Sequence, residues 1–302
     1  MMSAERFQAY AAEGYNRIPV VREVLSDLDT PLSVYLKLAD GPNTYLFESV
    51  EGGETWGRYS IIGLPAKRAF VFRGHLLEEQ EFGETIDSRT LDDPLAYVDV
   101  LRARYRVPKL DGLPDFSGGL VGYFGFETIA WIEPKLKMAD KPDYMDAPDA
   151  LLLLSEEVAV FDNLKGRLYL IVHADPAEPQ AYAKAQRRLD ELVYRLRQSG
   201  RSYPDVLHPS ILNEADFVSG FSEPEFTAAV EKAKDYIRAG DVFQVVLSQR
   251  MSVLFRARPV DVYRALRALN PSPYMYFLDL GSYQVVGSSP EILVRAKQGK
   301  VT

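Results

Sequence analysis

Short strand-like segments, each bounded by turn residues, follow one another along the first part of the chain and constrain its fold more than any other feature. The apolar block ALLLL at 150–154 suits a buried strand. It belongs to segment 149–163, which together with 166–174 is typical of a β-hairpin that turns at Asn163–Gly166. Further segments with strand character are 33–40, 43–50, 58–64 and 68–74. The fold must therefore bury several β-strands.

Helical patterns interrupt these strands. The segments predicted as helices are 93–105, 178–200, 222–240 and 259–270. In the third of them, Ser222 and Glu225 have the spacing of a capping box, and Gly240 supplies a left-handed stop. Strands are predicted again at 242–251, 283–289 and 291–295. The sequence therefore predicts a mixed α and β fold.

The composition restricts the classes of partner. The 302 residues include 43 acidic and 35 basic ones, a net charge of -8, without a basic run. A negative protein without a basic run is repelled by nucleic acid and by an anionic membrane, so it is a poor candidate to bind either. The chain has no cysteine and hence no disulfide, its N-terminus lacks the apolar core of a signal peptide, and it has no apolar run long enough to span a membrane. We therefore expect a cytoplasmic protein that binds neither nucleic acid nor membrane.

A domain boundary is predicted near residue 205. Residues 199–218 contain Gly, Ser, Pro and Asn without a sustained period, which is typical of a linker or an exposed loop. We therefore divide the chain into an N-terminal domain, 1–205, and the start of a second domain, 206–302. The last turn, at Gln298–Gly299, leaves little chain for the strand that follows. Because natural domains rarely leave a strand edge unpaired in this way, we expect the second domain to be truncated.

Two segments have the character of a ligand site, although each also has an ordinary structural explanation. In 46–60, Glu48 and Ser49 end a strand beside a glycine turn, where they could hold a ligand's ammonium or hydroxyl group or form a solvated turn. In 270–277, NPSPYMYF, the prolines end a helix and fix an extended backbone. The aromatic residues there could belong to the core, or form a flat wall against a ring-shaped ligand with Met275 filling around it. Periodicity does not decide between these alternatives.

A third segment, 285–295, places Glu291 at a bend between two predicted strands. A carboxylate there could act as an acid or a base, although exposed glutamates at strand ends are common. The histidines His75, His173 and His208 lie far apart and do not have the spacing of a metal site. The residues themselves therefore predict no metal site and leave the role of Glu291 open.

Five motifs, in their order and spacing, resemble one family. They are LFESVEGGETWGRYSIIG at 46–63, GGLVGYFGFE at 118–127, AGDVFQVVLSQR at 239–250, NPSPYMYF at 270–277 and VVGSSPEILVR at 285–295. Together they resemble component I of anthranilate synthase, the chorismate-binding subunit of that enzyme. The resemblance extends from about Ile18 to Thr302, and it is specific because all five motifs occur in register.

The resemblance implies a fold and a reaction. The fold is α+β, with a layered antiparallel β-sheet core, outer helices and strands from both halves of the sequence in shared sheets. The reaction adds ammonia to chorismate and eliminates pyruvate to give anthranilate, in the biosynthesis of tryptophan. Ammonia comes from glutamine through a glutamine amidotransferase subunit, component II. In this family Mg²⁺ holds the substrate carboxylate, and tryptophan inhibits by binding a separate site.

The same resemblance implies a tryptophan site made of two segments distant in sequence. The matching residues are Glu48, Ser49, Pro273, Tyr274 and Met275 and, nearby in the pattern, Asn270, Tyr276 and Gly287. Phe47 stands where many relatives have leucine, which is a conservative change.

For catalysis the resemblance implies two residues of this chain. Glu291 matches the active-site glutamate thought to assist departure of the ring hydroxyl. Gln244 stands where relatives that add water carry lysine, and a neutral amide cannot act as a base toward water. The metal ligands and most chorismate ligands are expected after Thr302, so we expect no metal in this chain and no activity from it alone. Two alternatives stay open, namely aminodeoxychorismate synthase component I of the folate pathway and a non-catalytic tryptophan-binding module.

Overall fold

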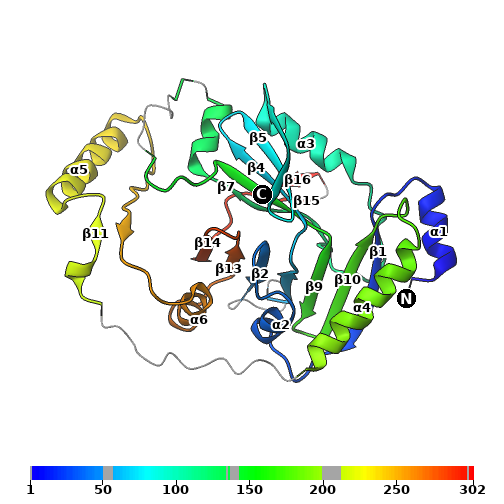
Figure 1. Cartoon of the computed structure of the whole chain (residues 1–302). Helices are drawn as coiled ribbons and strands as arrows, with labels where there is room; N and C mark the ends of the chain where they lie inside the picture. Colours follow the sequence, from blue (N-terminus) through cyan, green and yellow to red (C-terminus); the bar gives the residue numbers. More distant parts are fainter. Residues whose placement is uncertain (1, 50–56, 134, 137–142, 199–211, 298) are drawn as a thin grey trace. The chain divides into compact units, whose positions relative to one another are not determined.

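The structure is a computed structural model that describes residues 2–49, 57–133, 135–136, 143–198, 212–297 and 299–302 (Figure 1). These residues fall into two compact units, Met1–Arg201 with Pro259–Thr302, and Ser202–Arg258. The predicted boundary near residue 205 divides the chain by sequence, whereas the units follow the sheets. Residues from Pro259 onward belong with the first unit because they add strands to its main sheet.

The described part of the first unit is built around a seven-stranded antiparallel sheet. In spatial order its strands are β1 (Ile18–Leu25), β10 (Arg167–Ala174), β9 (Glu157–Asp162), β3 (Tyr59–Gly63), β2 (Thr44–Glu48), β13 (Tyr274–Asp279) and β14 (Gln284–Ser289). β13 pairs with β2, and Met275 lies opposite Glu48. The expectation that the two halves of the sequence share a sheet is therefore confirmed.

A second antiparallel sheet in the same unit has five strands among the described residues. Their spatial order is β6 (Glu84–Thr90), β5 (Leu76–Glu81), β4 (Arg68–Arg73), β8 (Ala150–Ser155) and β7 (Gly119–Phe124). Every residue of β8 is buried. Leu151 and Leu153 pack in a core shared with the first sheet, while Leu152 and Leu154 pack with Leu101 of α3 (Pro94–Arg104). The continuous apolar block follows from this burial of both faces.

Helices cover the other face of the seven-stranded sheet. They are α2 (Pro31–Leu38), α4 (Ala181–Arg197) and α6 (Pro259–Leu269), while α1 (Ala4–Ala12) packs against β1. α6 packs against β13 and β14 (Figure 1). Tyr35 of α2 and Tyr263 of α6 both contact Phe277, with ring centroids 5.6 and 6.0 Å from that of Phe277. The α+β fold with layered antiparallel sheets and outer helices is thus confirmed.

The predicted helices within 93–105, 178–200 and 259–270 are confirmed, but the strand predicted at 33–40 is wrong. That segment belongs to α2. Thr30 and Ser33 form a capping box, and Pro31 occupies the first turn, where its missing N–H costs nothing. These start signals lie just before the apolar residues and override their strand-like appearance.

The second unit is small. Its described elements are η3 (Glu214–Asp216), β11 (Val218–Ser219), α5 (Glu223–Ala239) and β12 (Met251–Ser252). The capping box of Ser222 and Glu225 and the left-handed Gly240 are confirmed. The strand predicted at 242–251 is wrong except at its last residue. Phe243 and Val246 are 93% and 81% exposed, so these apolar side chains are not packed within the described part of this unit.

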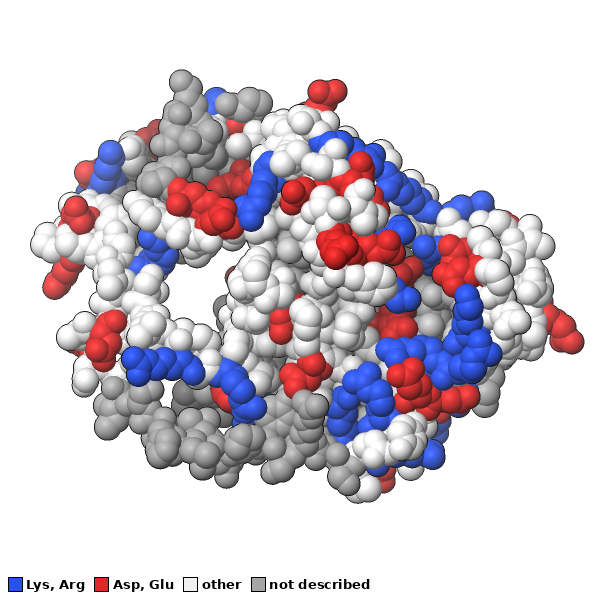
Figure 2. All heavy atoms as spheres, viewed as in Figure 1, with Lys and Arg blue, Asp and Glu red and all other residues white. Residues whose placement is uncertain are grey.

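The strand predicted at 291–295 is also wrong, because the next strands are β15 (Ala296–Lys297) and β16 (Lys300–Val301). Residues 199–211 of the predicted linker and the glycine turn at 50–56 lie outside the described residues. None of the described helices has the length and apolar character needed to cross a membrane. On the face shown in Figure 2, basic and acidic side chains are interspersed around the sheets of the first unit.

Candidate ligand pocket and catalytic residues

A cavity of ≈ 530 Å³ lies in the first unit between β2, β3, β13 and β14 of one sheet and β7 of the other. This volume is in the range of small-molecule sites. The lining residues are Phe47, Glu48, Ser49, Tyr59, Ile61, Gly122, Tyr123, Pro273, Tyr274, Met275, Tyr276, Leu278 and Val285. Of the residues predicted for the tryptophan site, all line the cavity except Asn270 and Gly287.

Strand pairing brings the two predicted segments together. Met275 lies opposite Glu48, and Tyr276 lies opposite Phe47, in the antiparallel ladder of β2 and β13. Pro273 directly precedes β13, so the end of one strand and the start of its neighbour meet at the same point. The backbone therefore assembles the pocket from residues that are far apart in sequence.

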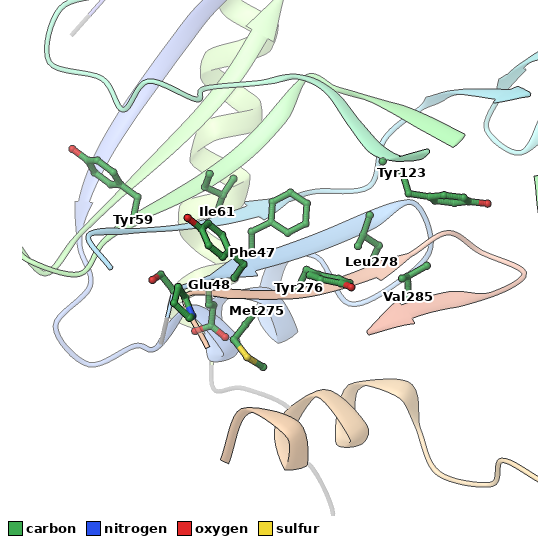
Figure 3. Close-up of a pocket in the computed structure, with 13 residues that line it drawn as sticks. Phe47, Glu48, Tyr59, Ile61, Tyr123, Met275, Tyr276, Leu278 and Val285 are labelled. Atoms are coloured by element: carbon green, nitrogen blue, oxygen red, sulfur yellow. The ribbon is translucent and has the colours of Figure 1, made fainter. Parts of the chain in front are cut away.

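The walls of the pocket are mainly apolar and aromatic. Successive side chains of a strand point to opposite faces of the sheet, so Tyr276 and Leu278 share a face. Both pack with the core between the sheets, as do Phe47 and Ile61. Figure 3 shows Phe47, Ile61 and Leu278 on one side of β2 and β13 and Met275 on the other. This arrangement suits a flat, largely apolar ligand group between the sheets.

Gly122 allows two strands of the opposite sheet to approach each other closely. A Cβ atom on Gly122 of β7 would lie 1.8 Å from the carbonyl oxygen of Leu151 in the neighbouring strand. Only the absence of a side chain permits this approach. Gly122 therefore lets β7 lie close to the backbone of β8 beside the pocket.

Tyr123 closes one end of the pocket. Its hydroxyl donates a hydrogen bond to the Pro148 carbonyl oxygen at 2.8 Å and lies 2.7 Å from the hydroxyl of Tyr283. Burial, with the bond to Tyr283, raises the pKa of the Tyr123 phenol far above its usual range. Because both hydroxyls are engaged, this part of the wall is held in one arrangement.

Glu48 belongs to the opposite face of the sheet, with α6. Its carboxylate accepts a hydrogen bond from the Tyr263 hydroxyl at 2.6 Å. Arg267 donates from Nε to Oε2 at 3.1 Å and from Nη2 to Oε1 at 3.2 Å. The Glu48 side chain is only 2% exposed, whereas that of Arg267 is 37% exposed. The bidentate contact fixes the plane of the carboxylate.

Tyr263 stabilises this arrangement as a donor. Its side chain is fully buried. Burial, together with the nearby negative charge of Glu48, raises the pKa of the Tyr263 phenol far above its usual range. The phenol therefore keeps its proton and donates a hydrogen bond to the buried carboxylate, which needs such a donor.

Asn270 and Gly287 lie beside the pocket rather than in its lining. Gly287 is opposite Tyr276 in the ladder of β13 and β14. The backbone oxygen of Asn270 accepts a hydrogen bond from Ser288 Oγ at 2.6 Å. Both residues therefore support the segment that forms the wall.

The two predicted catalytic residues, Gln244 and Glu291, belong to different units. Gln244 is exposed and belongs to the second unit, while Glu291 is exposed at a bend after β14 in the first unit. The backbone oxygen of Glu291 accepts a hydrogen bond from Ser289 Oγ at 3.0 Å. Within the described ranges, no group of three or more His, Asp or Glu residues is placed to share a metal ion.

Sequence reasoning missed several residues of the pocket. They are Tyr59, Ile61, Tyr123, Leu278 and Val285 in the lining, and Tyr263 and Arg267 on α6 behind Glu48. Alternation along β3 and β13 is a signal that could have placed the lining residues on one face. The two α6 residues have no such signal, because they depend on which strand lies beneath the helix.

Comparisons with known proteins find relatives along the whole chain. The family model of chorismate binding enzymes matches residues 61–302. The anthranilate synthase component 1 of Pseudomonas aeruginosa is 51% identical over 100% of this chain, which covers 61% of that protein. The protein of the same name from Neisseria meningitidis serogroup B is 49% identical with the same coverage. The chain thus spans 61% of the length of these relatives.

Solved structures share the fold. The crystal structure of anthranilate synthase component I from Streptococcus pneumoniae aligns with a TM-score of 0.68 at 30% identity, covering 92% of this chain and 59% of that one. The menaquinone-specific isochorismate synthase of Escherichia coli aligns with a TM-score of 0.54 at 16% identity, over 97% of this chain and 56% of that one. The second likeness concerns the fold alone.

Proposed function

The chain belongs to the family of chorismate binding enzymes, and we propose that it forms the N-terminal part of an anthranilate synthase component I. The whole protein would add ammonia to chorismate and eliminate pyruvate to give anthranilate, with Mg²⁺ and a glutamine amidotransferase subunit, in the cytoplasm. Support comes from relatives of that name, about half identical to the chain along its whole length.

The chain is not expected to perform this reaction alone. The described residues offer no group of carboxylates for Mg²⁺, which prefers oxygen ligands. We therefore expect no anthranilate fluorescence above a protein-free blank when the chain is mixed with chorismate, Mg²⁺ and ammonia. Turnover that scales with the concentration of the chain would contradict this.

Tryptophan is the proposed ligand of the pocket, as a feedback inhibitor of the whole enzyme. One observation carries this proposal: β2 and β13 bring Glu48–Ser49 and Pro273–Met275 to one cavity with aromatic walls. An indole ring fits such walls because aromatic groups pack favourably against one another at their edges and faces.

Titration calorimetry with L-tryptophan tests this assignment. We expect saturable binding to the chain and its loss in Ser49→Phe, because the larger side chain would occupy part of the cavity. Ser88→Phe, at an exposed position of the distant strand β6, makes the same change away from the pocket and should bind normally. Equal affinity in both variants would exclude the pocket as the tryptophan site.

A further inference from the structure

Helix α6 is attached to the pocket at two places. At its C-terminal end the chain continues through Ser272 and Pro273 into β13, so the helix and one wall are covalently continuous. Ser272 Oγ donates to the Ser289 carbonyl oxygen at 2.6 Å and accepts from the Tyr274 N–H at 3.2 Å. This connection is therefore fixed by hydrogen bonds as well as by the proline.

The second attachment is the Glu48 carboxylate. It ends β2, the other strand of the pocket, and is held by Tyr263 and Arg267 of α6. Neither of these two residues lines the cavity. Their hydrogen bonds to Glu48 are therefore a route by which they influence a ligand without touching it.

The direction of the Glu48 side chain limits its own role. Glu48 alternates with Phe47 along β2, and Phe47 packs between the sheets. The carboxylate thus lies on the α6 side, already bound to a guanidinium. A ligand ammonium group would have to compete with Arg267 for it, which costs affinity because the two cations repel each other.

From these contacts we propose that Tyr263 and Arg267 are positioning residues of the pocket, and that the Glu48 carboxylate ties β2 to α6 instead of receiving the ligand's ammonium group. This inference rests on tryptophan binding in the pocket. A ligand that orders Ser49 and Tyr274 then also orders α6, because both walls are fastened to this helix. By linkage, a change that disfavours the position α6 takes in the bound state lowers ligand affinity.

The position of α6 in the chain extends this relation. The helix begins at Pro259, directly after the last residue of the second unit, Arg258. Gln244 belongs to that unit. α6 is thus covalently continuous with the unit that carries Gln244.

The test measures tryptophan affinity by calorimetry for the wild-type chain and for Glu48→Gln, Tyr263→Phe, Arg267→Gln and Arg267→Lys. Thermal unfolding identifies any variant that fails to fold. The two conservative variants, Tyr263→Phe and Arg267→Lys, keep the test possible if one of the other changes prevents folding. Arg264→Gln is the matched control, since Arg264 lies one turn earlier on α6 and pairs with Asp261, away from Glu48.

If Tyr263 and Arg267 position the pocket through Glu48, Arg267→Gln and Tyr263→Phe should each lower the affinity for tryptophan about tenfold. This is the effect expected for loss of a hydrogen bond to a charged group. The double variant Glu48→Gln/Arg267→Gln should bind no more weakly than the weaker single one, because both remove the same connection. The control should bind like the wild type. If Glu48 received the ammonium group, Arg267→Gln would bind tryptophan more tightly, and this result would overturn the proposal.

Hydrogen exchange adds a measurement that a purely structural ion pair would not change. Tryptophan should slow exchange of the amide hydrogens of α6 after its first residue, Pro259, in the wild type and much less in Tyr263→Phe. Unchanged exchange of α6 in the wild type, despite binding, would overturn the proposal while leaving the pocket assignment intact. Absence of any saturable binding to the wild type would instead overturn the assignment of the pocket, and this inference with it.

Discussion

Tyr276 of β13 lies directly over Gly287 of β14. A Cβ atom added to Gly287 would be 2.1 Å from Cζ of the Tyr276 ring. Because Tyr276 forms part of the pocket wall, a glycine that does not itself line the cavity sets the position of a side chain that does. This relation explains how a residue beside the pocket can control its shape.

Gly287→Ala should therefore weaken tryptophan binding by about tenfold or more, because displacement of the ring changes the wall on which a ligand packs. Calorimetry measures the effect. Gly220→Ala is the control, since a Cβ there would be 3.5 Å from the Arg250 carbonyl oxygen, an ordinary contact. Wild-type affinity in Gly287→Ala would show that Tyr276 does not contribute to the site.

Asp162 is expected to stabilise the start of β3, which carries Tyr59 and Ile61 to the pocket. Its buried carboxylate accepts hydrogen bonds from Arg58 Nη2 at 2.9 Å and from the Lys165 N–H at 3.1 Å. We expect Asp162→Asn to lower the free energy of unfolding by about 1–3 kcal/mol at neutral pH, as measured by urea denaturation. Asp99→Asn, in an exposed pair with Arg102, should cost less than about 1 kcal/mol.

The effect of Asp162 should depend on pH. Burial alone would raise the pKa of Asp162, but the hydrogen bonds from Arg58 and from backbone N–H groups lower it below the usual value. The stability it contributes is therefore complete above the ordinary aspartate pKa of about 3.9 and is lost as the pH falls through the lower folded pKa. The difference between wild type and Asp162→Asn should shrink at the acid end of a denaturation series. A constant difference would contradict this.

His173 should give a pH dependence in a different range. Burial lowers the pKa of its imidazole, and Nε2 lies 2.7 Å from the Ser117 carbonyl oxygen, to which a neutral ring can donate. Below about pH 6.5 the unfolded chain takes up a proton that the folded chain does not, so stability falls as the pH decreases. His173→Gln should make the unfolding free energy less sensitive to pH between about 7.5 and 5.5.

The matched control for this measurement is His75→Gln, which changes an exposed histidine in the turn before β5. Thermal or urea unfolding is recorded for all three proteins across the same pH series. An undiminished slope in His173→Gln would mean that another group causes the pH dependence.

Local patterns predicted many of the elements but not their partners. The segments after the capping boxes at Thr30 and Ser222 give one incorrect and one correct prediction. Ser222 was followed by a helical period, so α5 could be predicted, whereas the residues after Thr30 look like a strand and form α2. The apolar residues Phe243 and Val246 predict a strand equally well, yet burial decides whether one forms, and they are exposed.

The pocket shows the same limit at the level of tertiary structure. Motif resemblance predicted that Glu48–Ser49 and Pro273–Met275 belong to one site, and the structure places them in one cavity. Periodicity alone could not pair β2 with β13, because pairing of distant strands depends on the packing of the whole sheet. For the same reason it could not identify Tyr263 and Arg267 as partners of Glu48.

The most direct test of the account is a crystal structure of the chain with bound tryptophan. We expect the indole ring between the sheets, against Phe47 and Tyr276, with Arg267 still bound to the Glu48 carboxylate. Tryptophan bound elsewhere on the chain, with this cavity empty, would contradict the assignment of the pocket.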